Sequence, residues 1–310
     1  TLAPLAYDEV YGSLVLSEDE KYPAVVIRDH GEGSALYVNL PLGYLKAYSD
    51  DLPMRSVMRM YLLREVGVPH LVPLPFNKPG LVLNWHIDDN REWKTTPNMI
   101  KDGIMKSIME YSIHITAGDF VENPGDNLGF DACGKGKKVV EEKMMPYGSV
   151  GSHGGWGHNW FAEQIATKLF TVAEMEHYIK INNDCIEEVT GRPVTEYSAP
   201  NGAFPQPESN RIMEKLGIIA YYNTADTGSA PNRTFVDGER PTTASISFPV
   251  MPFYQAASLY EIGEEYNYLP EEIKEFYEKT FDYVVDHRTI RLLYTHPYDL
   301  YDYLNEEQRN

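Results

Sequence analysis

The sequence predicts an α/β protein whose main part contains a parallel sheet, either open or closed into a barrel. From residue 81 onward, short apolar runs typical of buried strands alternate with longer segments that have the periodicity of amphipathic helices. The chain has 310 residues, 43% of which are hydrophobic. This length and composition support a sizeable core and one large domain, with room for a smaller one.

The beginning of the chain predicts a small α/β segment. Residues 22–27 and 35–40 are predicted strands on either side of a glycine-containing turn. A helix is predicted between Ser49, which suits an N-cap, and Gly67, which suits a helix stop.

A linker rich in proline and glycine covers residues 68–80. We therefore divide the chain into an N-terminal strand–helix segment, residues 1–78, and a main domain, residues 79–310. The first segment is short for an independent domain. One interpretation is that it is the remnant of a larger α/β module.

The main domain contains one helix with clear boundary signals. It begins at Thr171, which forms a capping box with Glu174, and it stops at Gly191. The other predicted elements are a strand at 81–83, a helix at 211–217, a strand at 218–223, a helix at 269–287 and a strand at 289–296.

Charge and cysteine content limit the classes of partner. The net charge of −19 disfavours nucleic acids and anionic membrane surfaces, and it suits a neutral or cationic ligand. No apolar run is long enough to span a bilayer, and no signal peptide is recognisable. The chain starts at Thr, which we interpret as a processed or trimmed form. Cys133 and Cys185 lack metal-type spacing, so they either pair or stay free.

Two adjacent acids follow the first predicted strand of the main domain. In "LVLNWHIDDN", residues 81–90, the apolar run leads to Asp88 and Asp89. Asp-Asp-Asn is good turn chemistry, so the pair is one way to end a strand at the surface. The alternative is a site at the carboxyl end of a strand, where α/β folds place theirs. One acid would then hold a metal while the other moves a proton.

A glycine-rich run carries two histidines. In "GSVGSHGGWGHNW", residues 148–160, His153 and His158 have four residues between them, three of which are glycine. Such a run disfavours a helix, and residues five apart do not share a helical face, so we predict a loop. This loop can aim both imidazoles at one point, and two His with one carboxylate form a common open metal site. A glycine-rich loop with two incidental histidines is the alternative.

Two further motifs lie late in the chain. In "EYSAPNGAFP", Ser198, Pro200 and Asn201 belong to a predicted turn. It is either a plain β-turn or a turn whose backbone N–H points into the site. His296 ends the predicted strand in "RLLYTHPYD", where a lone His is either structural or functional.

The order of these motifs resembles the polysaccharide deacetylase family, that is, the NodB-type or carbohydrate esterase family 4 fold. The resemblance covers roughly residues 80–300, and its most specific part runs from "GSHGGWGHNW" through a helix ending in "TG" to a turn with Pro-x-Gly and then "LG" and a strand. It implies a distorted (β/α) barrel that follows the small N-terminal α/β segment along the chain. It also implies a divalent metal, most simply Zn²⁺.

The resemblance also implies roles for individual residues. Asp88 is expected to be the general base, and His296 the general acid that protonates the leaving nitrogen. Asp89, His153 and His158 are expected to hold the metal, which lowers the pKa of a bound water toward about 7. The residues expected to support the oxyanion or the substrate are Pro200, Asn201 and Asp226.

The sequence departs from the family in three places. Four residues separate His153 and His158 where the family has three, and the motif nearest to Asp226 is only loosely present. The third departure is the loss of an Arg. Where the family has an Arg that orients the catalytic Asp, this chain has Ser198, whose side chain is far shorter. Another group must then orient Asp88. His86 lies on the same strand face as Asp88 and is the first candidate.

The expected function is metal-dependent removal of acetyl groups from an N-acetylated carbohydrate. The alternatives are a catalytically weak relative that binds carbohydrate and a hydrolase of a non-sugar amide. The expected partner is a carbohydrate or a small amide, with no nucleic acid and no membrane span. The resemblance further implies a secreted or periplasmic protein.

Overall fold

The structure is a computed structural model. It describes residues 9–17, 20–40, 52–70, 72, 74–223, 231–233, 236, 238–240, 244–250, 258–259, 261 and 267–302. The chain forms two compact units: one reaches from the N-terminus to Val72, and the other contains the described residues from Leu74 onward. Among the described helices, none combines the length and apolar character needed to cross a lipid bilayer.

The first unit contains an antiparallel sheet and a helix. Its strands are β1 (Glu9–Ser17), β2 (Glu20–His30) and β3 (Gly33–Val38), in the order β1-β2-β3. The two predicted strands correspond to β2 and β3. β1 was not predicted, because Gly12 and register shifts interrupt its alternation.

The helix of this unit, α2 (Leu52–Arg59), continues as one π-helical stretch, η1 (Met60–Glu65). The predicted stop, Gly67, follows it with a left-handed φ of 72°. The predicted N-cap, Ser49, lies outside the described residues.

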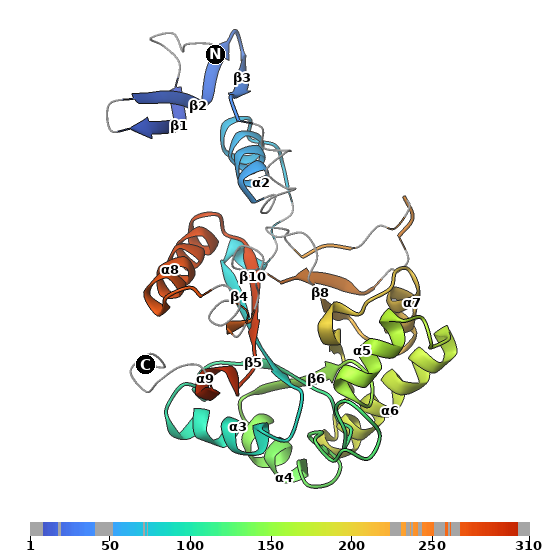
Figure 1. Ribbon diagram of the computed structural model, residues 1–310. Helices are drawn as coiled ribbons and strands as arrows, with labels where there is room; N and C mark the ends of the chain where they lie inside the picture. The colour runs from blue at the N-terminus through green and yellow to red at the C-terminus, as the bar shows by residue number, and fades with distance from the viewer. Residues whose placement is uncertain are drawn as a thin grey trace. The chain divides into compact units, whose positions relative to one another are not determined.

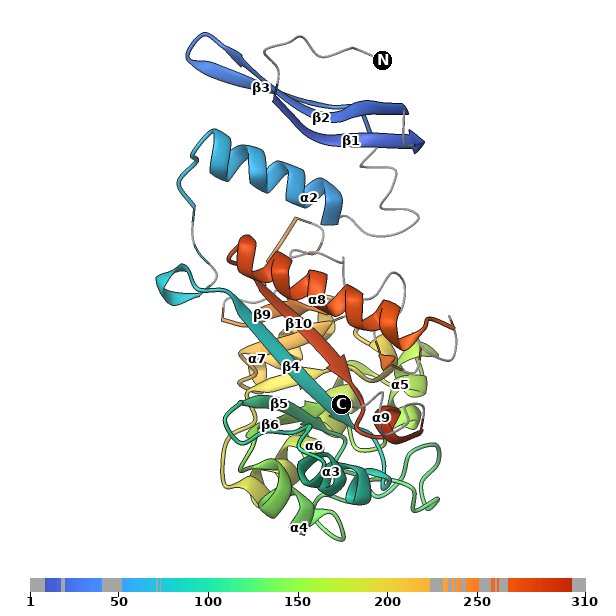
Figure 2. The same cartoon turned by 90° about the vertical axis from the view of Figure 1, so that its left-hand side faces the viewer.

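The second unit is a nearly closed parallel barrel of seven strands in the order β10-β4-β5-β6-β7-β8-β9 (Figure 1). The strands are β4 (Gly80–Ile87), β5 (Tyr111–Ile115), β6 (Gly148–His153), β7 (Glu196–Ser198), β8 (Ala220–Asn223), β9 (Ile246–Pro249) and β10 (Ile290–Thr295). The last strand pairs with the first in parallel (Figure 2). A bridge between Val250 and Leu292 links the other edge back to β10.

Helices surround this sheet on its outer side, and α8 lies beside β4 and β10 (Figures 1 and 2). The α-helices are α3 (Glu92–Lys101), α4 (Lys137–Val139), α5 (His158–Ala166), α6 (Val172–Thr190), α7 (Glu208–Lys215), α8 (Pro270–Asp286) and α9 (Asp299–Asp302). Shorter helical turns are η2 (Pro75–Asn77), η3 (Val140–Met144) and η4 (Pro200–Gly202). The sequence-predicted helices α6, α7 and α8 are confirmed, including the Thr171 capping box and the left-handed Gly191.

The predicted loop over residues 148–160 is wrong in its extent. Its first half is strand β6, which ends at His153, and helix α5 begins at His158. Only the four residues between the histidines form a turn. The glycines of β6 conceal the strand because they provide no alternation of apolar and polar side chains.

The strands have two different faces. Ile87, Ile113 and Ile115 face outward and belong to the main hydrophobic core, which the helices cover. The alternate residues of the same strands are polar and face into the barrel, among them Asn84, Ser112 and His114. A smaller group of apolar side chains is centred on Tyr222, Val250 and Leu292.

A disulfide supports the outer layer. Cys133 and Cys185 are bonded, with their Cα atoms 5.8 Å apart, and so connect the segment before α4 to helix α6. The sequence had left open whether these cysteines pair.

Candidate active site

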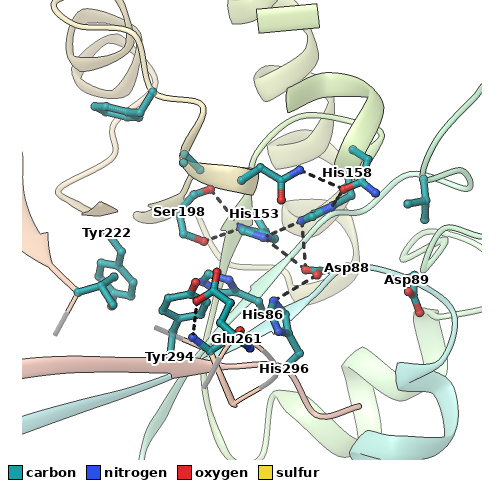
Figure 3. A pocket seen from close by; sticks show the side chains of 18 of the residues that line it. His86, Asp88, Asp89, His153, His158, Ser198, Tyr222, Glu261, Tyr294 and His296 are labelled. Carbon is teal, nitrogen blue, oxygen red and sulfur yellow. Dashed lines mark hydrogen bonds and ion pairs between the residues drawn. The ribbon is translucent and has the colours of Figure 1, made fainter. Parts of the chain in front are cut away.

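A cavity of about 790 Å³ opens at the carboxyl ends of the barrel strands. Its lining includes three predicted site residues with ionisable side chains at its centre: Asp88, His153 and His158. Figure 3 shows these side chains pointing toward one another. Their position agrees with the rule that parallel α/β sheets place their sites beyond the carboxyl ends of strands.

Asp88, His153 and His158 form a compact buried cluster. Asp88 Oδ1 lies 3.3 Å from His153 Nε2 and 3.4 Å from His158 Nε2, and the two Nε2 atoms are 3.1 Å apart. Asp88 directly follows β4, His153 ends β6 and His158 begins α5. The four-residue connection between β6 and α5 therefore brings the two imidazoles together.

The turn between the two histidines depends on a glycine. Gly154 has a φ of 76°, and a Cβ atom at this position would overlap the ring of Pro200. Pro200 itself is buried and belongs to η4. The turn can therefore approach η4 closely only without a side chain at residue 154.

Asp89 lies apart from the cluster. The Arg91 guanidinium binds its carboxylate, with Nη2 2.7 Å and Nε 2.9 Å from Oδ2, and the Arg91 backbone N–H donates to Oδ1. Figure 3 shows Asp89 well separated from the histidines. The sequence placed Asp89 at the metal and Asp88 at the proton, but the structure brings Asp88 to the histidines. The reason is strand alternation, because Asp88 continues the inward face of Asn84 and His86.

His296, the residue directly after β10, joins the cluster. Its Nε2 lies 3.3 Å from Asp88 Oδ2, and its Nδ1 lies 3.0 Å from Asp299 Oδ2. Tyr298 donates a hydrogen bond of 3.1 Å to the same Asp88 oxygen. Arg91 stacks over the Tyr298 ring at 3.5 Å. Tyr298 was not singled out from the sequence, although it lies only two residues after His296.

The candidate orienter His86 does not bond to Asp88. Its buried Nε2 has no hydrogen-bond partner among the described residues. Its ring stacks on Tyr294, with centroids 4.4 Å apart, and lies beside His153 at 4.0 Å. The groups that contact Asp88 Oδ2 are instead Tyr298 and His296.

Ser198 does not reach toward Asp88 either. Its hydroxyl lies 2.7 Å from Nδ1 of His153, on the side of that ring away from Asp88. Asn201 lines the cavity and donates from its side chain to Asn159. Asp226 lies outside the described residues.

Burial and neighbouring charged groups shift the pKa values of the residues in the cluster. Burial raises the pKa of Asp88, but His158 and His296 outweigh it and hold the pKa well below its usual range. Burial lowers the pKa of His153 to about 4 despite its contact with Asp88. For His296, burial is outweighed by Asp88 and Asp299, which raise the pKa to about 9. The cluster thus combines an ionised carboxylate with a neutral and a protonated imidazole.

Comparison with known proteins relates this barrel to a group of solved structures, among them a deacetylase and an allantoinase. No family model and no curated protein matches the chain. A probable polysaccharide deacetylase from Pseudomonas aeruginosa PAO1 has 11% identity and a TM-score of 0.55, over 76% of this chain and 84% of that one. Puue allantoinase has 12% identity and a TM-score of 0.53, over 80% and 88%. This chain has the polysaccharide deacetylase fold.

Within this deacetylase fold, the three central residues suit a divalent metal. Their ligand atoms, one carboxylate oxygen and two imidazole nitrogens, lie within 4.8 Å of one another. Asp88 Oδ1 accepts no hydrogen bond from the described residues although it is buried. A carboxylate with two imidazoles is an established donor set for zinc and related metals, and it leaves positions for water and substrate.

Proposed function

We propose that this protein is a metal-dependent hydrolase that removes acetyl groups from an N-acetylated carbohydrate. The observation that supports this most is the buried cluster of Asp88, His153 and His158, at the mouth of a barrel with the deacetylase fold. The cavity also presents aromatic rings, including those of Phe204, Tyr294 and Tyr298, which suit contact with sugar faces.

The proposed metal ligands are Asp88 through Oδ1 and His153 and His158 through Nε2. Zn²⁺ is the simplest occupant of this donor set. When bound, it would activate a water molecule and polarise the substrate carbonyl. Asp89 is not included, because Arg91 occupies its carboxylate.

The proposed proton transfers involve the second carboxylate oxygen of Asp88. Its Oδ2 would accept the proton of the attacking water, which is the base role that the resemblance implies for this residue. His296 Nε2, 3.3 Å from Oδ2, is the proposed acid that protonates the leaving nitrogen. Asp299 fixes the ring of His296 from behind. The Asn201 backbone N–H is the proposed oxyanion donor, a role typically worth about 3–4 kcal/mol.

A second candidate function is carbohydrate binding without turnover. The position of the two acids favours this function. The resemblance implies one acid for the metal and another for the proton, but here only Asp88 faces the histidines, and Asp89 is bound to Arg91. A hydrolase of a non-sugar amide would use the same groups on a different substrate.

One experiment separates these functions. The full chain is incubated with N-acetylglucosamine oligomers and peptidoglycan fragments, and acetate release is measured together with bound metal. Metal-dependent acetate release that His153→Ala abolishes supports the deacetylase. Saturable oligomer binding without acetate release supports the binding protein instead. Metal content equal in wild type and His153→Ala contradicts the proposed metal site.

We further propose that the protein works in an oxidising compartment, which includes the secreted or periplasmic location expected from the resemblance. The Cys133–Cys185 disulfide supports this, because such bonds persist mainly outside reducing compartments.

A further inference from the structure

The hydroxyl of Ser198 lies between two buried imidazoles. Its Oγ is 2.7 Å from Nδ1 of His153 and 2.8 Å from Nδ1 of His114, which projects from β5. All three side chains are almost completely buried. A single hydroxyl therefore connects a proposed metal ligand to a second histidine that lies outside the catalytic cluster.

The connection continues to a carboxylate on β7. His114 Nε2 lies 3.0 Å from Ser112 Oγ, and Ser112 donates a 2.7 Å hydrogen bond to Glu196 Oε2. Tyr222 donates to the same Glu196 oxygen at 3.1 Å. We call the series Ser198, His114, Ser112 and Glu196 the interior chain.

Hydrogen-bond chemistry fixes the direction of the interior chain. If His153 keeps Nε2 free for a metal, its Nδ1 carries the proton and donates to Ser198 Oγ. Ser198 has one proton, so it donates to His114 Nδ1, and His114 then carries its own proton on Nε2. That proton is donated to Ser112, which donates to Glu196. Every donor has an acceptor, and the series ends at a group that only accepts when ionised.

A glycine makes the interior chain possible. His114 and Glu196 come from β5 and β7, and β6 lies between these strands. The β6 residue in register with His114 is Gly151. A Cβ atom there would lie 2.6 Å from the His114 ring and 2.9 Å from Glu196 Cβ. The absent side chain thus lets groups from two non-adjacent strands meet.

We propose that the interior chain positions the metal ligand His153, by fixing its tautomer and ring orientation so that Nε2 faces Asp88 and His158. This inference rests on the proposed function, since it concerns the same metal site. Ser198, His114 and Glu196 are positioning residues, because none of them contacts Asp88 or His158 in the described structure. Ser198 thereby acts on His153, and not on Asp88 as the Arg of the related motif does.

Charge at the end of the interior chain supports this assignment. Burial opposes ionisation of Glu196, but two neighbours lower its pKa to about 2: His114, whose Nε2 also lies 3.4 Å from Glu196 Oε2, and Ser112. A carboxylate that receives a hydrogen bond from a ligating imidazole raises the basicity of the ligand. Here the same effect of Glu196 reaches His153 through Ser112, His114 and Ser198.

The test is zinc affinity, measured by competition with a chromophoric chelator on the full chain. Ser198→Ala is expected to weaken Zn²⁺ binding by about 10–100-fold, the usual effect of removing a group that supports a ligand. Ser198→Thr, which keeps the hydroxyl, is expected to bind close to wild type. Glu196→Gln keeps an acceptor oxygen but loses the charge, so its expected loss lies at the lower end of that range. Ser245→Ala removes another buried serine hydroxyl, which donates to Ile218 outside the cavity, and is the matched control.

A second measurement reports the tautomer of the His153 ring. In the metal-free protein, ¹⁵N NMR of histidine side chains should show His153 as one tautomer in the wild type, protonated at Nδ1, and as a mixture in Ser198→Ala. A folded Ser198→Ala protein with wild-type zinc affinity and one tautomer overturns the inference while leaving the metal site intact. A loss of affinity that Ser245→Ala shares also overturns it. If wild type and His153→Ala bind zinc equally, the proposed function fails, and this inference with it.

Discussion

Asp88 presents its two carboxylate oxygens to different neighbours. Oδ1 faces the imidazoles of His153 and His158, while Oδ2 faces His296 and the hydroxyl of Tyr298. A single buried acid thus connects the proposed metal to the proposed proton donor. Asp89, the next residue, is bound to Arg91 and is only part-buried.

This difference predicts opposite behaviour of two neighbouring variants. Asp88→Asn is expected to lose more than about 100-fold in Zn²⁺ affinity, beyond the usual effect of groups that only support a ligand. Asp89→Asn is expected to keep its metal, because Asp89 does not face the histidines. Metal analysis and zinc titration of both purified variants check this. Metal loss in Asp89→Asn with retention in Asp88→Asn would restore the assignment made from the sequence.

The hydroxyl of Tyr298 provides a second prediction for a single residue. Tyr298→Phe removes the 3.1 Å hydrogen bond to Asp88 and leaves the ring in place. Hydrogen bonds to charged groups contribute about 1.5–3 kcal/mol, so kcat should fall by roughly 10–100-fold while zinc stays bound.

The control for Tyr298→Phe is Tyr301→Phe. Tyr301 also donates to a carboxylate, at 3.0 Å from Asp102 Oδ2, but it does not line the cavity. Steady-state kinetics on the substrate found in the acetate-release experiment should show a loss only in Tyr298→Phe. Equal kcat values in the two variants would mean that Tyr298 does not orient Asp88.

At the scale of the element, β4 and β5 show an alternation of polar and apolar residues that is visible in the sequence. Asn84 and His86 alternate with Trp85 and Ile87 along β4, and Asp88 continues this alternation directly after the strand. Ser112 and His114 alternate in the same way with isoleucines along β5. This period of two identifies Asp88 as the acid that points into the barrel. Adjacency alone could not choose between Asp88 and Asp89, because it carries no information about the strand face.

Other parts of the site could not be predicted from local patterns. The contact of Ser198 with His153 and His114 depends on the order of β5, β6 and β7 in the sheet, which only the tertiary structure determines. Strands β7 and β9 are short, at three and four residues, so their periodicity is weak. The long helices α6 and α8 were predictable because they repeat the helical pattern over several turns.

The turn between β6 and α5 gives a prediction at this scale. Gly154→Ala places a Cβ against Pro200 at a positive φ, so it should lower the free energy of unfolding by about 1–3 kcal/mol. It should also weaken zinc binding, because the turn sets the positions of His153 and His158.

Gly191→Ala is the control for this turn. Gly191 has a φ of 66°, but a Cβ there would meet nothing within 4 Å. Gly191→Ala should lower the free energy of unfolding by about 1–2 kcal/mol, because of the left-handed backbone alone, and should leave zinc affinity unchanged. Urea unfolding and zinc titration measure both effects. Wild-type zinc affinity in a folded Gly154→Ala protein would show that the turn does not control the histidines.

For the barrel unit as a whole, the Cys133–Cys185 bond closes a loop between residues separated by 52 positions. Loop-closure entropy predicts that removing this crosslink lowers the free energy of unfolding by roughly 4 kcal/mol. Urea unfolding of wild type with and without reductant checks the size of the effect. A Cys133→Ala/Cys185→Ala variant should match reduced wild type and should not respond to reductant. A response of the double variant to reductant would assign the effect to something other than this bond.

The pairing of β10 with β4 determines when the site can be completed during synthesis. Gly80 pairs with Ile290, so almost the entire domain must be made before the last strand can join the first. Chains emerge from the ribosome N-terminus first, and contacts between distant residues form late. Asp88, His153 and His158 come from the first half of the domain, whereas His296 arrives with its last strand. A nascent chain can therefore assemble the proposed metal ligands well before it acquires the proposed proton donor, so metal capture can precede catalytic competence.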